Sequence, residues 1–237
     1  MLYLIGIGLN LKSFSLESIE TIKKCKKVYL EAYTVDFPYE LNELENTIGQ
    51  FEILGREGVE SSKLIDESKK NDIALLVYGS PLFATTHLTL ISDCKKAKVK
   101  YGVFFSASIF DALGETGLEL YKFGKITSMP RWQKNFEPDS FLDVVRDNLS
   151  IKAHSLILCD IGLGFVDALK QLEESLNRKK MKIEEIVVAS SLGSQKGKIY
   201  YDSLINMKKK HKDIANPFCI IIPSELHFME KEWLEGL

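Results

Sequence analysis

The sequence predicts an α/β fold built as two domains, and three observations lead to this prediction. Short apolar runs alternate with amphipathic segments along the chain, which is the pattern of strand–helix units around a largely parallel sheet. An irregular, glycine-containing segment at 108–135 interrupts this alternation near the middle of the chain. A length of 237 residues is enough for two domains that each bury a core. We therefore expect an N-terminal α/β domain over 1–107 and a C-terminal α/β domain over 108–237.

The first expected domain holds five strand candidates. The apolar run 2–7 ends at Gly6 and Gly8, and IALLVY at 73–78 is the strongest central strand. Further strands are expected at 28–32, 51–54 and 99–105, and helices at 15–26, at 58–70 and from about Ala84. Ser15 is a candidate N-cap of the first helix, because its hydroxyl can accept a backbone N–H of the first turn.

The second expected domain repeats the alternation after the irregular segment. Its expected strands are SLILCD at 155–160, EIVVAS at 185–190 and PFCIIIP at 217–223. Its expected helices cover 139–149, 165–178, 199–210 and a short stretch at the C-terminus. These apolar runs have strand length, and the segments between them have helical spacing.

Composition excludes several classes of protein. The hydrophobic fraction is 45%, the charged fraction 27% and the formal net charge −2, so no overall field favours nucleic acid or an acidic membrane. No apolar run reaches the roughly 20 residues that a membrane helix needs, and the N-terminal run is interpreted as a strand. The four cysteines are far apart and form no C-x-x-C motif, which suits a reducing cytoplasm and argues against zinc.

Small or polar residues gather after five of the expected strands, where α/β proteins build ligand clefts. The clusters are Gly6-Ile7-Gly8, 78–87, 106–109, 190–194 and 223–227. A dinucleotide fold would require a glycine at position 11, where this chain has Leu11. Plain turns and helix caps explain the same residue types, and His87 is either a base or a structural histidine. Motifs of hydrolases, kinases and metalloenzymes are absent, so no metal site is expected.

Read in order, the clusters resemble the diphthine synthases, a family of S-adenosylmethionine (SAM) methyltransferases with the tetrapyrrole-methylase fold. The matching stretches are LYLIGIGL (2–9), KVYLEAYT (27–34), ALLVYGSPLFATTH (74–87), SASIFDALGETGLELYKFG (106–124), the start of the helix at 138–144, HSLILCDI (154–161) and PSELHFME (223–230). They span nearly the whole chain. VYLEAYT, ATTH and TGLELYKFG are not general α/β patterns, so the resemblance is specific.

The resemblance implies two α/β domains with SAM in the cleft between them, in a cytoplasmic homodimer. It implies methylation of the modified histidine of translation elongation factor 2, at the amino group of its 3-amino-3-carboxypropyl arm. Eukaryotic relatives add a further methyl group to the carboxylate. The SAM contacts that the resemblance implies are Leu9, Ser80, Phe83, Ser108, Ile109, Cys159, Leu192 and His227. Asp160 and His227 are the candidates for a catalytic base, and proton removal by solvent is the alternative.

Two departures from the family pattern keep other interpretations open. Ser80 stands where the family usually has aspartate in a G-D-P turn, and the segment after Asp160 is short. Loss of that carboxylate removes a charge-assisted hydrogen bond worth roughly 1.5–3 kcal/mol. One alternative is a methyltransferase of the same fold that acts on a tetrapyrrole or on ribosomal RNA. The other is a degenerate SAM-binding protein without turnover.

Overall fold

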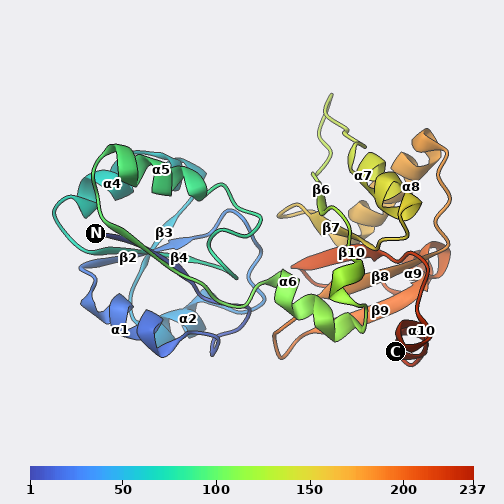
Figure 1. Cartoon of the computed structure of the whole chain (residues 1–237), viewed down its shortest axis with the longest axis horizontal. Helices are drawn as coiled ribbons and strands as arrows, with labels where there is room; N and C mark the ends of the chain where they lie inside the picture. Colours follow the sequence, from blue (N-terminus) through green and yellow to red (C-terminus); the bar gives the residue numbers. More distant parts are fainter. The chain divides into compact units, whose positions relative to one another are not determined.

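The structure is a computed structural model that describes all residues, Met1–Leu237. The chain forms two compact units, Met1–Asp111 and Ala112–Leu237, and each contains one five-stranded sheet (Figure 1). This arrangement confirms the predicted α/β class with two sheets.

The sheet of the first unit is entirely parallel. Its strands have the order β3-β2-β4-β1-β5. Their bounds are β1 Leu2–Gly6, β2 Lys27–Glu31, β3 Glu52–Leu54, β4 Ile73–Val77 and β5 Tyr101–Phe104. Every residue of β4 is buried, as expected for a central strand covered by helices on both faces.

Helices cover both faces of this sheet. Helices α1 (Leu16–Lys24) and α2 (Leu41–Ile48) lie on one face, and α4 (Lys63–Ser68) and α5 (Leu88–Lys96) lie on the other (Figure 1). Alternate residues of β4 point to opposite faces, so Leu75 packs with the α4 and α5 cluster and Leu76 with the α1 and α2 cluster. As predicted, the Oγ of Ser15 caps α1 by accepting the N–H of Ser18 at 3.0 Å.

Three expectations for this unit were inaccurate. The single helix expected at 58–70 is two short helices, α3 (Arg56–Glu60) and α4, separated at residues 61–62. Helix α5 begins at Leu88 and not near Ala84, because Ala84 has a left-handed φ of 56° that cannot continue a helix. Helix α2 was not predicted.

The sheet of the second unit is mixed, so the expectation of a largely parallel sheet is wrong here. Its order is β6-β7-β10-β8-β9, with β10 antiparallel to both β7 and β8. The bounds are β6 Thr127–Met129, β7 Ser155–Cys159, β8 Glu185–Ser190, β9 Lys198–Ser203 and β10 Phe218–Ile222. The apolar pattern of a buried strand reports its burial and carries no information about its direction.

The segment 199–210, which was expected to be one helix, is a strand in its first half and a helix in its second half. Residues 198–203 form β9, which pairs with β8 in an antiparallel hairpin, and only Leu204–Lys210 form helix α9. The turn at 191–197 reverses the chain so that the next residues pair with β8. Ile199, Tyr200 and Tyr201 are β-branched or aromatic residues, which favour a strand. Ser203 then caps α9 by accepting the N–H of Asn206 at 3.2 Å.

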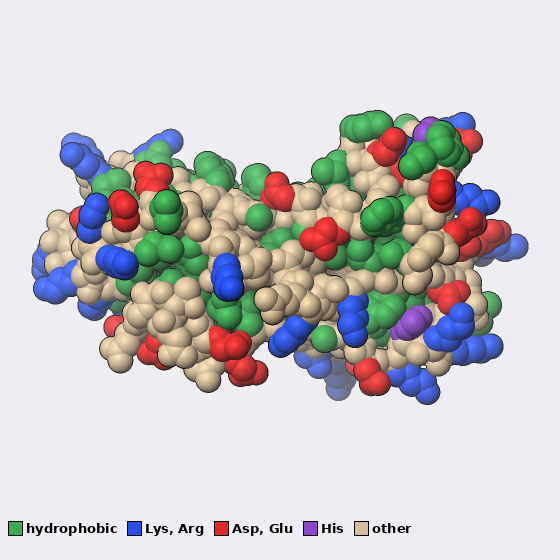
Figure 2. All heavy atoms as spheres, turned by 90° about the horizontal axis from the view of Figure 1, so that it is seen from below, with side chains coloured by type: hydrophobic (Ala, Val, Ile, Leu, Met, Phe, Trp, Pro, Cys, Tyr) green, Lys and Arg blue, Asp and Glu red, His purple; other side chains and the backbone are tan.

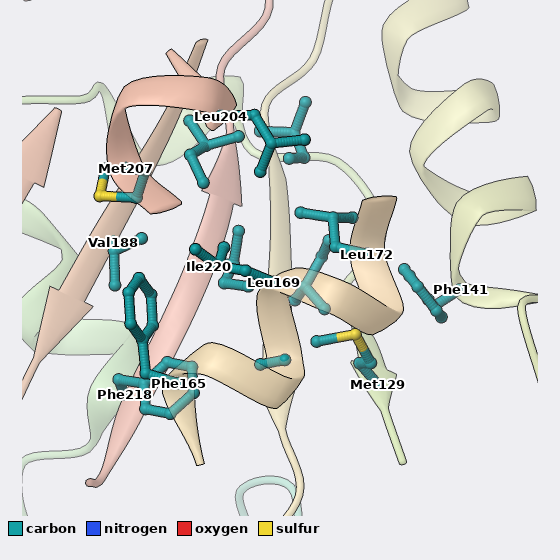
Figure 3. Packing of buried hydrophobic residues seen from close by; sticks show 14 of the residues in the cluster. Met129, Phe141, Phe165, Leu169, Leu172, Val188, Leu204, Met207, Phe218 and Ile220 are labelled. Atoms are coloured by element: carbon teal, nitrogen blue, oxygen red, sulfur yellow. The ribbon is translucent and has the colours of Figure 1, made fainter. Parts of the chain in front are cut away.

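The core of the second unit lies between its sheet and helices α7 (Phe141–Ser150), α8 (Phe165–Lys179) and α9. Figure 3 shows Phe165 of α8 against Phe218 of β10, with ring centroids 5.5 Å apart in an edge-to-face contact. The remaining helical elements are α6 (Ile109–Ala112), η1 (Leu113–Thr116), η2 (Leu120–Lys122) and α10 (Phe228–Glu235).

The surface carries charges of both signs. Figure 2 shows Lys and Arg side chains interspersed with Asp and Glu side chains on one face, in keeping with a formal net charge of −2. None of the helices combines the length and the apolar character that crossing a membrane requires.

Candidate functional site

The carboxyl ends of β1 and β4 form a topological switch point in the first unit. Strand β1 leads through α1 to β2, beyond β4, whereas β4 leads through α5 to β5, beyond β1. The two connections therefore leave in opposite directions and over opposite faces of the sheet (Figure 1). In open α/β sheets, ligands bind in the crevice at such a point, outside the carboxyl ends of the strands.

The loops that follow β1 and β4 pack against each other through glycines. The N–H of Gly8 donates to the carbonyl of Gly79 at 3.1 Å, and the N–H of Gly79 donates back to Gly8 at 3.0 Å. Both residues have left-handed φ values, +68° and +70°. A Cβ at Gly8 would lie 2.2 Å from Cβ of Ser13, so no larger side chain fits. These glycines hold the turns in close contact, which accounts for them without any phosphate.

Ser80 stands at this switch point with an unused hydroxyl. The residue is 2% exposed, and its Oγ has no hydrogen-bond partner. Its backbone carbonyl accepts the N–H of Phe83 at 3.2 Å, which fixes the turn after β4. A buried hydroxyl without a partner is destabilising by about 1–3 kcal/mol, so such a group in a native protein requires an explanation. A polar ligand at the switch point would supply one.

The other predicted residues of the first unit lie on the same loops. Leu9 is buried, and its carbonyl accepts the phenol of Tyr78 at 3.2 Å. Phe83 is 45% exposed and packs against Phe110, with ring centroids 5.6 Å apart.

Ser108 and Ile109 form the start of helix α6. The N–H and Oγ of Ser108 donate to Oδ2 of Asp111 at 2.7 and 2.9 Å, so this hydroxyl is already used within the protein. Ile109 begins the helix directly after it.

Glu31 is a buried residue of this region that motif analysis did not single out. It ends β2, and its carboxylate accepts the N–H groups of Tyr33 and Thr34 at 2.7 and 2.9 Å. Its Oε2 lies 3.9 Å from Nε2 of His87, whose Nδ1 contacts the carbonyl of Pro81 at 3.0 Å. His87 therefore has a structural role between two loops. The signal was present in the sequence, because Glu31 and His87 belong to the unusual stretches VYLEAYT and ATTH.

Three predicted residues of the second unit, Cys159, Asp160 and Leu192, lie at or just after the ends of β7 and β8. Cys159 ends β7, and burial raises the pKa of its thiol well above the usual value, so it is not a thiolate nucleophile. The carboxylate of Asp160 accepts the backbone N–H groups of Arg131 and Ile161, each at 3.0 Å. Leu192 is buried in the turn after β8. Asp160 thus shapes a turn through both of its oxygens.

His227 follows β10, whose C-terminal end lies at the opposite end of the sheet's strands from Cys159. Because β10 is antiparallel to β7, Ile222 pairs with Ser155 at the beginning of β7, while Cys219 pairs with Leu158 near its end. A rise of about 3.3 Å per residue separates the two ends of β7 by roughly 13 Å. Residues 223–227 therefore follow the end of β10 that pairs with the beginning of β7, whereas Cys159 and Asp160 lie at the other end of β7.

Comparison with known proteins identifies the family. The family model described as tetrapyrrole (corrin/porphyrin) methylases matches residues 1–206. The diphthine synthase of Methanocaldococcus jannaschii is 37% identical over 255 residues, covering 100% of this chain and 98% of that protein. The chain belongs to the diphthine synthases of the tetrapyrrole methylase family. This membership confirms the predicted resemblance and makes the chain a methyltransferase.

Three further comparisons also cover nearly the full length of this chain. The diphthine methyl ester synthase of Schizosaccharomyces pombe is 41% identical over 267 residues, covering 100% of this chain and 94% of that protein. A crystal structure of a protein from Entamoeba histolytica, described as a putative diphthine synthase, has a TM-score of 0.88 at 28% identity, with 100% and 97% of the two chains covered. Another crystal structure of a diphthine synthase has a TM-score of 0.86 at 30% identity, with 99% and 94% covered.

Proposed function

We propose that this diphthine synthase transfers methyl groups from SAM to the amino group of the 3-amino-3-carboxypropyl-histidine of translation elongation factor 2. The observation that carries the proposal is the full-length identity of 37% to a diphthine synthase. This likeness favours that substrate over a tetrapyrrole or ribosomal RNA. The buried, unpartnered hydroxyl of Ser80 supports a polar ligand at the switch point of the first unit.

The proposed SAM contacts are those that the resemblance implies. In the first unit they are Leu9, Ser80, Phe83, Ser108 and Ile109, which lie on the loops after β1, β4 and β5 and at the start of α6. In the second unit they are Cys159, Leu192 and His227. Ser80 offers a free hydroxyl, Leu9 and Leu192 offer buried apolar surface, and Phe83 offers an exposed ring. This set suits a molecule with an apolar ring and polar ends.

Methyl transfer from SAM requires little direct participation by protein side chains. SAM supplies an activated methyl group on a cationic sulfonium, and the protein has to align the acceptor amine and exclude water. The amine has to lose a proton before it attacks. The carboxylate of Asp160 accepts two backbone N–H groups and so has a structural role in its turn. We propose that solvent takes the proton, with Asp160 and His227 as the side-chain candidates.

A second product is favoured by one comparison. The S. pombe relative, which is 41% identical, is named a diphthine methyl ester synthase, whereas the archaeal relatives are named diphthine synthases. We therefore include methylation of the substrate carboxylate, after the amino group, as a candidate activity of this chain.

We also propose that the protein is a homodimer in the cytoplasm. Apolar side chains such as Tyr121, Phe228 and Trp233 are more than half exposed, which offers surface for a homodimer. All four cysteines are unpaired, which suits a cytoplasmic protein. Light scattering of the purified protein tests the dimer.

Two measurements test the proposed function. Calorimetric titration with SAM and with S-adenosylhomocysteine should show binding in the micromolar range. Incubation with SAM and elongation factor 2 that carries the unmethylated histidine arm should then add methyl groups, counted by mass spectrometry. Methylation of the amine alone gives diphthine, and an added methyl that is labile to mild alkali indicates the ester. SAM binding without any transfer would instead identify a degenerate binder.

A further inference from the structure

We propose that Glu230 is a positioning residue that, through a buried network with His154 and Lys122, fixes residues 223–227 and thereby the side chain of His227. The network lies entirely within the second unit. The inference rests on the proposed function, in which His227 contacts the methyl donor.

The side-chain carboxylate of Glu230 accepts four hydrogen bonds. Its side chain is 1% exposed. Oε1 accepts the backbone N–H of Glu119 at 2.9 Å and Nε2 of His154 at 3.0 Å. Oε2 accepts the backbone N–H of His227 at 2.7 Å and Nζ of Lys122 at 2.5 Å. The buried carboxylate is therefore fully satisfied, and its donors come from residues 119–122, from His154 before β7 and from the start of α10.

His154 has a single protonation pattern that is consistent with its contacts. The backbone N–H of Ser224 points at its Nδ1 at 2.9 Å, and a backbone N–H can only donate. Nδ1 must therefore carry the lone pair, and Nε2 carries the hydrogen that is donated to Glu230. A proton added at Nδ1 would face the N–H of Ser224 and break this link.

Together these side chains hold the 223–227 segment at three backbone positions. His154 accepts from Ser224, Lys122 donates to the carbonyl of Glu225 at 3.0 Å, and Glu230 accepts from His227. The imidazole of His227 is itself the N-cap of α10, where Nδ1 receives the N–H of Met229 at 3.5 Å. Glu230 and His227 thus form a reciprocal capping box at the start of α10.

This arrangement serves positioning more than stability. A buried ion pair is a weak source of net stability, and apolar replacements are often neutral or stabilising. The three backbone contacts, by contrast, define the path of one loop that ends in an exposed histidine. A side chain that is held in its binding geometry before the ligand arrives loses less conformational entropy on binding.

The test is a double-mutant cycle on SAM affinity in the full chain. Glu230→Gln removes the charge that Lys122 and His154 share, and His227→Ala removes the proposed contact. We expect each single variant to weaken SAM binding about tenfold, and the double variant to bind like His227→Ala alone, because Glu230 acts through His227. Leu176→Ala, a core change in α8 of the same unit, is the control for general destabilisation and should leave SAM affinity unchanged at a temperature where the protein is folded.

Milder variants keep the test decisive if Glu230→Gln does not fold. His154→Asn retains an acceptor for Ser224 but loses the donor to Glu230, whereas His154→Gln retains the donor and loses the acceptor. Both should weaken SAM binding and speed amide hydrogen exchange at His227. Unchanged SAM affinity in the folded Glu230 and His154 variants would overturn the inference and leave the proposed function intact. Absence of SAM binding to the unaltered protein would overturn the proposed function, and the role of His227 with it.

Discussion

Nε2 of His87 lies 3.9 Å from Oε2 of Glu31, and both side chains are almost completely buried. Glu31 ends β2, and His87 precedes α5, so the loops after β2 and β4 meet here, although Nε2 of His87 has no hydrogen-bond partner. Nδ1 of His87 contacts the carbonyl of Pro81, the residue after Ser80. Two stretches that resemble the diphthine synthases, at 27–34 and 74–87, therefore lie next to each other beside the candidate site.

Glu31→Gln should destabilise the protein by about 1–3 kcal/mol, because the amide replaces an oxygen that accepts hydrogen bonds inside the fold. The affected donors are the N–H groups of Tyr33 and Thr34 and the hydroxyl of Thr34, which donates at 2.6 Å. Urea-induced unfolding measures the loss. Glu60→Gln, which removes an exposed pair with Arg56, is the matched control and should change stability by less than about 1 kcal/mol. Equal effects of the two variants would argue against a structural role for Glu31.

Ser80→Ala should weaken SAM binding without lowering stability, because the hydroxyl has no partner within the protein. Calorimetry and thermal unfolding of the same samples separate the two effects. Thr116→Val is the control, since the Thr116 hydroxyl donates to Leu113 at 2.7 Å and its removal should destabilise by about 1 kcal/mol. Ser80→Asp, which restores the carboxylate usual in the family, should raise SAM affinity about tenfold. A Ser80→Ala variant that binds SAM as well as the unaltered protein would remove Ser80 from the site.

Asp160→Asn should leave the methyl-transfer rate and its pH profile unchanged, because solvent is the proposed proton acceptor and the carboxylate serves the turn by accepting the N–H groups of Arg131 and Ile161. Single-turnover transfer to elongation factor 2 measures the rate. The amide keeps one acceptor, so a modest loss of stability is expected. A large fall in rate, with the protein folded and SAM affinity retained, would make Asp160 the base.

Acid should destabilise the second unit in two stages. Burial is the main cause that lowers the pKa of His154 from 6.5, so the unfolded chain binds this proton first and stability falls as the pH drops below about 6.5. Burial raises the pKa of Glu230, but hydrogen bonds from Lys122, Glu119, His227 and His154 outweigh it and lower the pKa from 4.5 to about 2. Its contribution is complete above pH 4.5 and is lost as the pH falls toward 2.

Thermal unfolding measured against pH checks this prediction. His154→Gln should lack the first stage, whereas His211→Gln, in the same unit but outside the network, should retain it. A His154→Gln profile parallel to that of the unaltered protein would show that other groups cause the loss.

The sequence by itself determined the fold class and most of the buried strands. Runs such as 73–78 and 217–223 are apolar along their whole length, and burial on both faces requires that pattern. The cap at Ser15 was also predictable, because capping is a contact within one turn. The resemblance to the diphthine synthases lay in the order of the loop stretches and needed no coordinates.

Only the tertiary structure decided the direction of β10, the strand character of 198–203 and the partners of the buried charges. Whether a strand is parallel or antiparallel depends on the strands that lie next to it in the sheet. Strand β10 lies between β7 and β8, which are both distant from it in sequence. Glu31 and His87 are 56 positions apart, and His154 and Glu230 are 76 apart, so no local pattern relates them. Periodicity reports whether a residue is buried, because burial depends on the local helix or strand. The partner that satisfies a buried charge is set by packing between elements, which only the folded chain specifies.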